Sequence, residues 1–179
     1  MKRLPALPLA LCAGLALGQP KTDWELEVER RGWTEGEYKV PARPKPEDLI
    51  EFYVSAATDF RFFVDPQSLS VGNDGVVRYT LLARSRSGVE NVTYGGIRCS
   101  AARYRIYAVG RSGGGWTERE SDWRPIEQNT AQRSHHALWS EYFCPQRIPI
   151  FDVAEGIDAL RRGGHPNAEG LQRGAGGRF

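Results

Sequence analysis

Residues 73–85 read NDGVVRYTLLARS and combine the clearest turn of the chain with its longest alternating stretch. Asp74-Gly75 supports the positive φ angles that tight β-hairpins require, so it predicts a hairpin that joins residues 68–71 to residues 76–85. Alternate residues of a strand lie on the same face of a sheet. Here Val77, Tyr79, Leu81 and Ala83 fall on one face, and Arg78, Thr80 and Arg84 share the other with Val76 and Leu82. This alternation predicts a long β-strand.

Further strands are expected on both sides of this hairpin. Residues 52–54 and 60–64 are rich in aromatic and β-branched side chains, and Asp65-Pro66 is typical of a turn after the second of them. Downstream, residues 92–99 and 104–108 alternate, with a bulge expected at Gly95-Gly96 that resets the alternation and brings Ile97 and Cys99 inward. Trp116 opens a last short strand. The pattern predicts an antiparallel β meander of about five or six strands.

After Pro125, hydrophobic residues no longer recur at every second position but at the spacing typical of a helix. A helix with Asn129 or Thr130 as its N-cap is predicted here. One face of this helix is formed by Ala131, His135, Leu138, Trp139 and Tyr142. A second helix starts at Asp152, which forms a capping box with Glu155, and stops at Gly163-Gly164. The sequence therefore predicts an α+β fold, in which one or two C-terminal helices pack on the meander.

The two ends of the chain have a different character from its middle. Met1-Lys2-Arg3 followed by the apolar residues 4–17 is typical of a secretory signal peptide, with cleavage after Gly18. A lipoprotein acylated at Cys12 is the alternative, but Leu11 is too bulky for the last lipobox position. We expect four segments: a signal peptide (1–18), an irregular N-terminal arm (19–48), an α+β domain (49–162) and a disordered tail (163–179). Export predicts the periplasm as the location.

Charge and cysteine content change once the leader is removed. The full chain has 24 Lys and Arg and 22 Asp and Glu, and removal of Lys2 and Arg3 leaves 22 of each. The mature chain therefore has no net charge that would favour binding to nucleic acid or to a membrane surface. No transmembrane segment is expected in the mature chain. Cys99 and Cys144 remain, and in an oxidising compartment they predict one disulfide that pins the end of the first helix to the sheet. A metal pair or a redox dithiol requires closer spacing, and the sequence has no C-x-x-C.

No residue set carries a recognisable catalytic or metal-binding motif. His135 and His136 are adjacent and point about 100° apart on a helix, so they cannot easily share a metal. His135 is expected to be partly buried and His136 to face solvent. The sequence has no G-x-S-x-G, and its carboxylate pairs lie in charged, exposed contexts. We therefore predict no metal, no cofactor and no catalytic residue.

Arginines and a tyrosine on adjacent strands form the best candidate for a binding face. Arg84, Arg103 and Arg105 are expected on the polar side of the sheet beside Tyr107. Such a surface can hold an anionic ligand or a partner protein, because guanidinium groups form forked hydrogen bonds and stack on rings. The alternative is a solvated face whose charges keep the sheet soluble.

Several motifs together resemble a known family. They are Phe62-Phe63-Val64-Asp65, Asp74-Gly75-Val76-Val77-Arg78-Tyr79-Thr80-Leu81, Gly96-Ile97-Arg98-Cys99, Trp123-Arg124-Pro125-Ile126 and Glu141-Tyr142-Phe143-Cys144-Pro145. The chain is similar over about residues 24–166 to the family named after the cryptic neisserial protein, exported proteins of mainly proteobacterial envelopes. Gly95 departs from the acidic residue expected there. The resemblance implies export and a shared domain but no activity.

The arrangement of strands and cysteines is also similar, more distantly, to the surface-adhesin protein E group, whose members bind host matrix components. Three functions remain open. The first is an exported cell-envelope protein that acts as a non-catalytic binding or structural module, with an envelope protein or an anionic ligand as partner. The second is a periplasmic hydrolase with a site assembled from scattered residues, and the third is a surface adhesin.

Overall fold

A computed structural model describes residues 32–168 of the chain. The predicted signal peptide, its cleavage after Gly18, the alternative at Cys12 and the last residues of the tail lie outside the described residues. Residues 35–168 belong to one compact unit, and this unit holds every described helix and strand.

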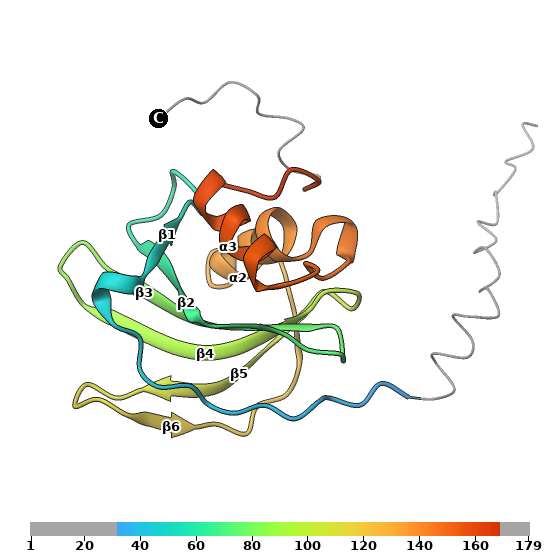
Figure 1. The fold of residues 1–179 in the computed structure, drawn as a ribbon. Helices are drawn as coiled ribbons and strands as arrows, with labels where there is room; N and C mark the ends of the chain where they lie inside the picture. Colours follow the sequence, from blue (N-terminus) through green and yellow to red (C-terminus); the bar gives the residue numbers. More distant parts are fainter. Residues whose placement is uncertain (1–31, 169–179) are drawn as a thin grey trace, which may run out of the picture. The chain divides into compact units, whose positions relative to one another are not determined.

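The unit is built on one antiparallel sheet with strand order β1-β2-β3-β4-β5-β6, and β7 pairs with β5 (Figure 1). The strands are β1 (Ile50–Phe52), β2 (Arg61–Val71), β3 (Val76–Arg84), β4 (Glu90–Arg98), β5 (Arg103–Gly110), β6 (Trp116–Glu118) and β7 (Arg124–Pro125). The helical elements are η1 (Pro46–Asp48), α2 (Arg133–Ala137), η2 (Leu138–Phe143), η3 (Pro145–Arg147) and α3 (Val153–Arg162). The predicted α+β meander with C-terminal helices is confirmed.

The hairpin between β2 and β3 forms where the sequence predicts it, but β2 is longer than expected. Asp65-Pro66 does not end a strand; it lies inside β2, where the register shifts between Asp65 and Ser70. Pro66 has no N–H to donate to the ladder. Ser68 bridges the irregularity instead, because its Oγ donates to the Asp65 carbonyl (2.8 Å) and accepts from the Thr80 N–H (2.8 Å). The irregularity therefore leaves the strand continuous.

We call the side of the sheet that α2, η2 and α3 cover its inner face. Val77, Tyr79 and Leu81 of β3 lie there, in the main hydrophobic core, as their alternation predicts. The rings of Tyr79 and Phe143 are 5.5 Å apart between centroids. The core is thus shared between the sheet and the helical layer.

The opposite side, the outer face, is covered by the N-terminal arm, residues 35–48, which crosses the sheet on the side away from α2 and α3 (Figure 1). Trp116 Nε1 donates to the Pro41 carbonyl at 2.8 Å, and Val40 packs on the outer cluster of Tyr94, Tyr107 and Ala108. Consequently β3 is buried on both faces, including its charged residue Arg78.

The predicted bulge lies next to Gly95, but the extra residue belongs to β5 rather than β4. Tyr94 pairs with Ala108 and Gly95 with Ile106, so Tyr107 is the additional residue. Alternation along β4 is not reset; instead Ala108 moves to the outer face. The bulge brings β5 close to β4, since a Cβ added at Gly95 would lie 2.6 Å from the Arg105 carbonyl oxygen. A glycine suits this position for that reason.

The first predicted helix forms in two parts, and its predicted cap is wrong. Gln132 is the N-cap residue of α2, although Asn129 Oδ1 accepts a hydrogen bond from the Gln132 N–H (3.0 Å). The chain then continues as a π-helix, η2, whose wider turn allows the consecutive residues Tyr142 and Phe143 both to be buried. Tyr142 Oη donates to the Tyr53 carbonyl at 2.9 Å, which fixes η2 above β1.

The ends of α3 agree with the prediction. Asp152 Oδ1 accepts from the Glu155 N–H (2.8 Å), and Gly163 adopts a left-handed conformation (φ 78°) as the C-cap. The described chain continues beyond residue 162. His165 and Ala168 are buried, and the His165 N–H donates to the Glu141 carbonyl at 2.6 Å. The start of the segment expected to be a tail therefore packs on η2.

The disulfide predicted between Cys99 and Cys144 is present, with a Cα–Cα distance of 5.3 Å and a sequence separation of 45. Cys99 directly follows β4, and Cys144 directly follows η2. The bond therefore ties the helical layer to a central strand. Closing a loop of this length restricts the unfolded chain by about 4 kcal/mol.

Candidate functional site

The predicted binding-face residues lie on the outer face, but not in one place. Arg84 ends β3 and its Nε donates to Glu90 at 2.8 Å. Arg103 begins β5, at the opposite end of the sheet, and donates to the Trp123 carbonyl at 3.1 Å. Arg105 and Tyr107 lie between them and converge on a single carboxylate. Of the four residues, the structure brings only these two together.

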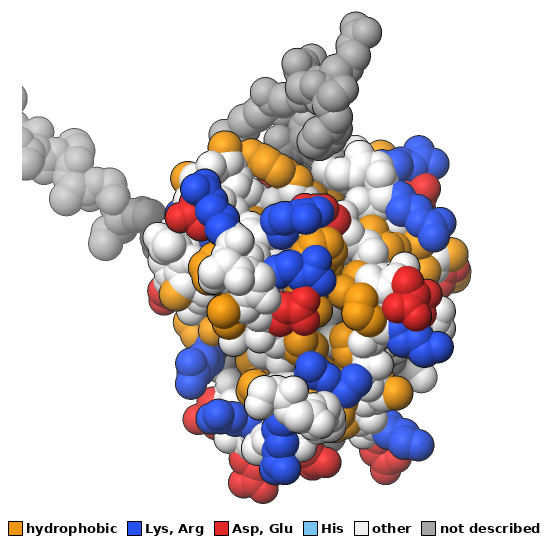
Figure 2. Space-filling model, turned by 90° about the vertical axis from the view of Figure 1, so that its left-hand side faces the viewer, with side chains coloured by type: hydrophobic (Ala, Val, Ile, Leu, Met, Phe, Trp, Pro, Cys, Tyr) orange, Lys and Arg blue, Asp and Glu red, His pale blue; other side chains and the backbone are white. Residues whose placement is uncertain are grey.

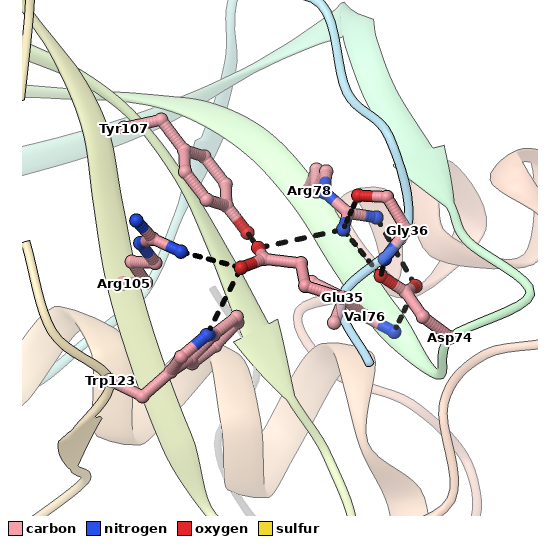
Figure 3. A network of polar contacts seen from close by, with 8 residues as sticks. All are labelled: Glu35, Gly36, Asp74, Val76, Arg78, Arg105, Tyr107 and Trp123. Atoms are coloured by element: carbon pink, nitrogen blue, oxygen red, sulfur yellow. Dashed lines mark hydrogen bonds and ion pairs between the residues drawn. The ribbon is translucent and has the colours of Figure 1, made fainter. Parts of the chain in front are cut away.

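That carboxylate belongs to Glu35 of the arm (Figure 3). It accepts hydrogen bonds from Arg105 Nη1 (2.6 Å), Tyr107 Oη (2.5 Å) and Trp123 Nε1 (3.3 Å). The Glu35 side chain is 15% exposed, so these donors replace most of the water that the charge would otherwise bind. The anion bound on this face is therefore the Glu35 carboxylate, which belongs to the protein itself.

A buried ion pair lies beside Glu35. Arg78 and Asp74 form a bidentate contact, with Nη2 to Oδ2 at 2.5 Å and Nη1 to Oδ1 at 3.3 Å. Asp74 also accepts from the N–H groups of Gly36 (2.7 Å) and Val76 (3.1 Å). Arg78 Nη2 donates to the Gly36 carbonyl at 3.3 Å and lies 3.7 Å from Glu35 Oε1. Together with Glu35, Arg105, Tyr107 and Trp123, these residues form what we call the arm network.

The arm network is balanced in charge, with two carboxylates and two guanidinium groups. Burial raises the pKa of Asp74, but the hydrogen bonds from Arg78 and from two backbone N–H groups outweigh it and hold this pKa below its usual value. Burial and the hydrogen bond to Glu35 raise the pKa of Tyr107 far above the ordinary value for tyrosine. At neutral pH, Tyr107 is a neutral donor and Asp74 a charged acceptor. The network can therefore hold the arm, and Glu35 occupies Nη1 of Arg105.

Sequence analysis missed most of the arm network. The sequence predicts Asp74 as a turn residue and Arg78 as one of several arginines on adjacent strands, and it assigns no partner to either. The apolar neighbours of Arg78 on that face, Val76 and Leu82, were a signal that the face is covered. Nothing in the local sequence distinguishes Glu35 from the other acidic residues of the arm.

Two of the three histidines, His135 and His165, contact other side chains inside the described unit. His135 is partly buried, as predicted: its ring stacks on Tyr104 (4.2 Å between centroids), and Nδ1 lies 3.0 Å from Tyr79 Oη. Burial lowers the pKa of His135 to about 4, so the ring is neutral at physiological pH. His165 is buried, with Nε2 2.9 Å from Glu155 Oε1 and Nδ1 accepting from the Asn167 N–H (3.1 Å). Within residues 32–168, no three His, Cys, Asp or Glu side chains lie close enough to hold a metal ion.

The surface around the arm network is polar. A shallow hollow of about 790 Å³ beside it is lined by Tyr38, Arg105, Tyr107 and residues 118–122. On the side of the molecule drawn in Figure 2, acidic and basic side chains are interspersed with hydrophobic ones.

Over residues 32–168, no helix combines the length and the apolar character that crossing a bilayer requires.

Residues 28–161 match the CNP1-like family, and this match covers most of the chain. The chain belongs to the CNP1-like family. The match confirms the resemblance drawn from the strand and cysteine motifs. No curated protein and no solved structure matches the chain. The CNP1-like family has no known function, so membership assigns no role to the arm network, and the similarity to surface adhesins stays a prediction.

Proposed function

We propose that this CNP1-like protein is an exported, periplasmic cell-envelope protein that acts as a non-catalytic binding or structural module. Its start, with Lys2 and Arg3 before the apolar residues 4–17, has the organisation of a cleaved leader. The disulfide between Cys99 and Cys144 suits an oxidising compartment, where such bonds form and persist.

One observation carries the non-catalytic assignment: Glu35, His135 and His165, three side chains of the types that serve as general bases, are engaged in contacts within the fold. Glu35 is bound by Arg105, Tyr107 and Trp123. The Nδ1 atom of His135 is engaged by Tyr79, and both ring nitrogens of His165 have partners. A general base needs an accessible lone pair within reach of a substrate proton, and these groups do not offer one.

Fractionation of cells that express the full chain tests the proposal. We expect the protein in the osmotic-shock fraction, with Gln19 as its first residue by mass spectrometry and with no free thiol on Cys99 or Cys144. A chain that retains Met1 and stays in the cytosol would overturn the assignment. Accumulation of the precursor under globomycin would instead favour acylation at Cys12, and cleavage by protease added to intact cells would favour an adhesin.

A periplasmic hydrolase is the second candidate, and one observation favours it. Ser55, His136 and Glu141 line the same surface hollow. These are the residue types of a nucleophile, a base and an orienting acid. Hydrolysis of ester or amide substrates that disappears in both Ser55→Ala and His136→Ala would favour the enzyme over the binding module.

A further inference from the structure

A hollow of about 440 Å³ lies beside the junction of α2 and η2. These helices lie on the opposite side of the sheet from the arm (Figure 1). The residues that matter for its chemistry are Ser55, Gln128, Arg133, His136 and Glu141. The volume falls in the range of sites that bind small molecules. Most of the lining is polar, so the hollow suits a polar ligand rather than a hydrophobic one.

Glu141 of η2 lines this hollow together with His136 and Ala137 of α2. η2 is a π-helix, whose turn is wider than that of an α-helix. Single π-helical turns recur at functional sites.

Glu141 is a half-buried carboxylate without an ion pair or hydrogen bond to its side chain within residues 32–168. Its backbone carbonyl, by contrast, accepts from the His165 N–H. Burial raises the pKa of Glu141, which is the expected cost of a carboxylate that lacks a partner. A cationic group placed in the hollow would remove this cost.

Arg133 provides the opposite charge in the same hollow. Its Nη1 donates to the Ala57 carbonyl at 2.8 Å and its Nη2 lies 3.5 Å from Thr130 Oγ1, so the guanidinium group is held in place. A guanidinium group has five N–H donors, and several remain after these contacts. Arg133 therefore keeps donors for a carboxylate.

From this arrangement we propose that the hollow binds a small zwitterion, an amino acid or a short peptide, with its ammonium group at Glu141 and its carboxylate at Arg133. The inference rests on the proposed binding function and names its ligand class. A zwitterion neutralises both charges at once, whereas a neutral sugar leaves the Glu141 carboxylate without a cation. His136, Gln128 and Ser55 supply hydrogen bonds to the rest of the ligand.

Glycylglycine is the probe, titrated into the full mature chain and followed by backbone amide NMR. We expect shifts confined to residues 54–55 and 128–141, with a dissociation constant on the order of 1 mM for so small a ligand. N-acetylglycylglycine lacks the ammonium group and glycylglycinamide lacks the carboxylate. Each blocked peptide is expected to bind roughly tenfold more weakly.

Two variants assign the ends of the ligand. Glu141→Gln should bind glycylglycine and N-acetylglycylglycine equally, and Arg133→Gln should bind glycylglycine and glycylglycinamide equally. Glu141→Asp should restore part of the preference for a free ammonium group. Glu118→Gln, a change at an exposed residue of β6 outside the hollow, is the matched control and should bind as the unchanged protein does. Thermal unfolding of each variant verifies that it is folded.

Three results would overturn the inference: no shift around the hollow at 20-fold the expected dissociation constant, equal binding of the blocked and free peptides, or equal binding of N-acetylglucosamine. None of these three results bears on the proposed location in the cell envelope, because that location is tested separately by fractionation and by the thiol state of the cysteines. Cleavage of glycylglycine during the titration would support the ligand class and favour the hydrolase over the binding module.

Discussion

Glu35 accepts a hydrogen bond from Arg105 Nη1 at 2.6 Å across a sequence separation of 70 residues. This contact joins an arm without regular secondary structure to β5, near the far edge of the sheet. Because the same carboxylate also accepts from Tyr107 and Trp123, one side chain fastens the arm over the outer face. The stability of the whole unit should therefore depend on Glu35.

Replacing Glu35 with glutamine keeps the shape of the side chain but removes its charge and turns one acceptor into a donor that faces Arg105. We expect Glu35→Gln to lower the free energy of unfolding by about 2–3 kcal/mol, because Arg105 loses its charged acceptor in a site that water reaches poorly. Urea denaturation measures this change. Glu37→Gln alters an exposed residue of the same arm and should stay within about 0.5 kcal/mol of the unchanged protein. Equal effects of the two variants would contradict the anchoring role.

Removal of the disulfide tests the connection between the sheet and the helical layer. The double variant Cys99→Ser with Cys144→Ser should lose about 4 kcal/mol, mainly because its unfolded chain gains freedom. Urea denaturation of the unchanged protein with and without dithiothreitol should show a similar difference. Reductant should have no effect on the double variant, which serves as the control. If reductant destabilised both proteins equally, the bond would not be the cause.

The bulge in β5 makes a clear prediction for Gly95. A Cβ at this position would lie 2.6 Å from the Arg105 carbonyl oxygen, and a backbone atom cannot move aside as the end of a side chain can. Gly95→Ala should therefore cost about 2–3 kcal/mol by overpacking. Gly113→Ala is the matched control, because a Cβ there meets nothing within 4 Å. Equal melting temperatures for the two variants would show that β4 and β5 are less closely paired.

His135 should make stability depend on pH. Its pKa is about 4 in the folded protein and near the ordinary value of 6.5 in the unfolded chain. Between these values the unfolded state binds more protons, so the free energy of unfolding falls as the pH drops from 6.5 toward 4, by roughly 2–3 kcal/mol. Asp65 and Glu141, whose pKa values burial raises, act in the opposite direction.

The variant His135→Gln isolates this contribution, because glutamine can still accept a hydrogen bond from Tyr79 but does not titrate. Urea denaturation at several pH values should show a flatter profile for the variant between pH 6.5 and 4. The absolute stability of the variant is not the test, since the stacking on Tyr104 is also lost. Parallel profiles for the two proteins would exclude His135 as the source of the pH dependence.

The strands and the second helix were predictable because their signals are local. Asp74-Gly75 can form its turn and Asp152 can cap its helix within a few residues of chain. The predictions failed where distant packing decides the outcome. Asp65-Pro66 continues a strand in which Ser68 bridges the irregularity, and residues 138–143 form a π-helix in which Tyr142 and Phe143 are both buried.

The candidate sites follow the same division. Sequence placed Arg105 and Tyr107 on one face, because alternation along a strand is a local property. It could not show that Glu35 occupies their donors, since the energy of that contact depends on burial under the arm. It also assigned His136 to solvent without relating it to Glu141 or to Ser55, which reaches the hollow from the loop after β1.

By itself, the sequence determined the antiparallel meander, the C-terminal helices and the pairing of Cys99 with Cys144, since turn chemistry, periodicity and an even number of cysteines require no knowledge of the partner surface. Only the tertiary structure decided which polar groups are engaged and which are free. That choice depends on desolvation and on contacts between residues far apart in the chain, and it separates the occupied arm network from the open hollow at Glu141.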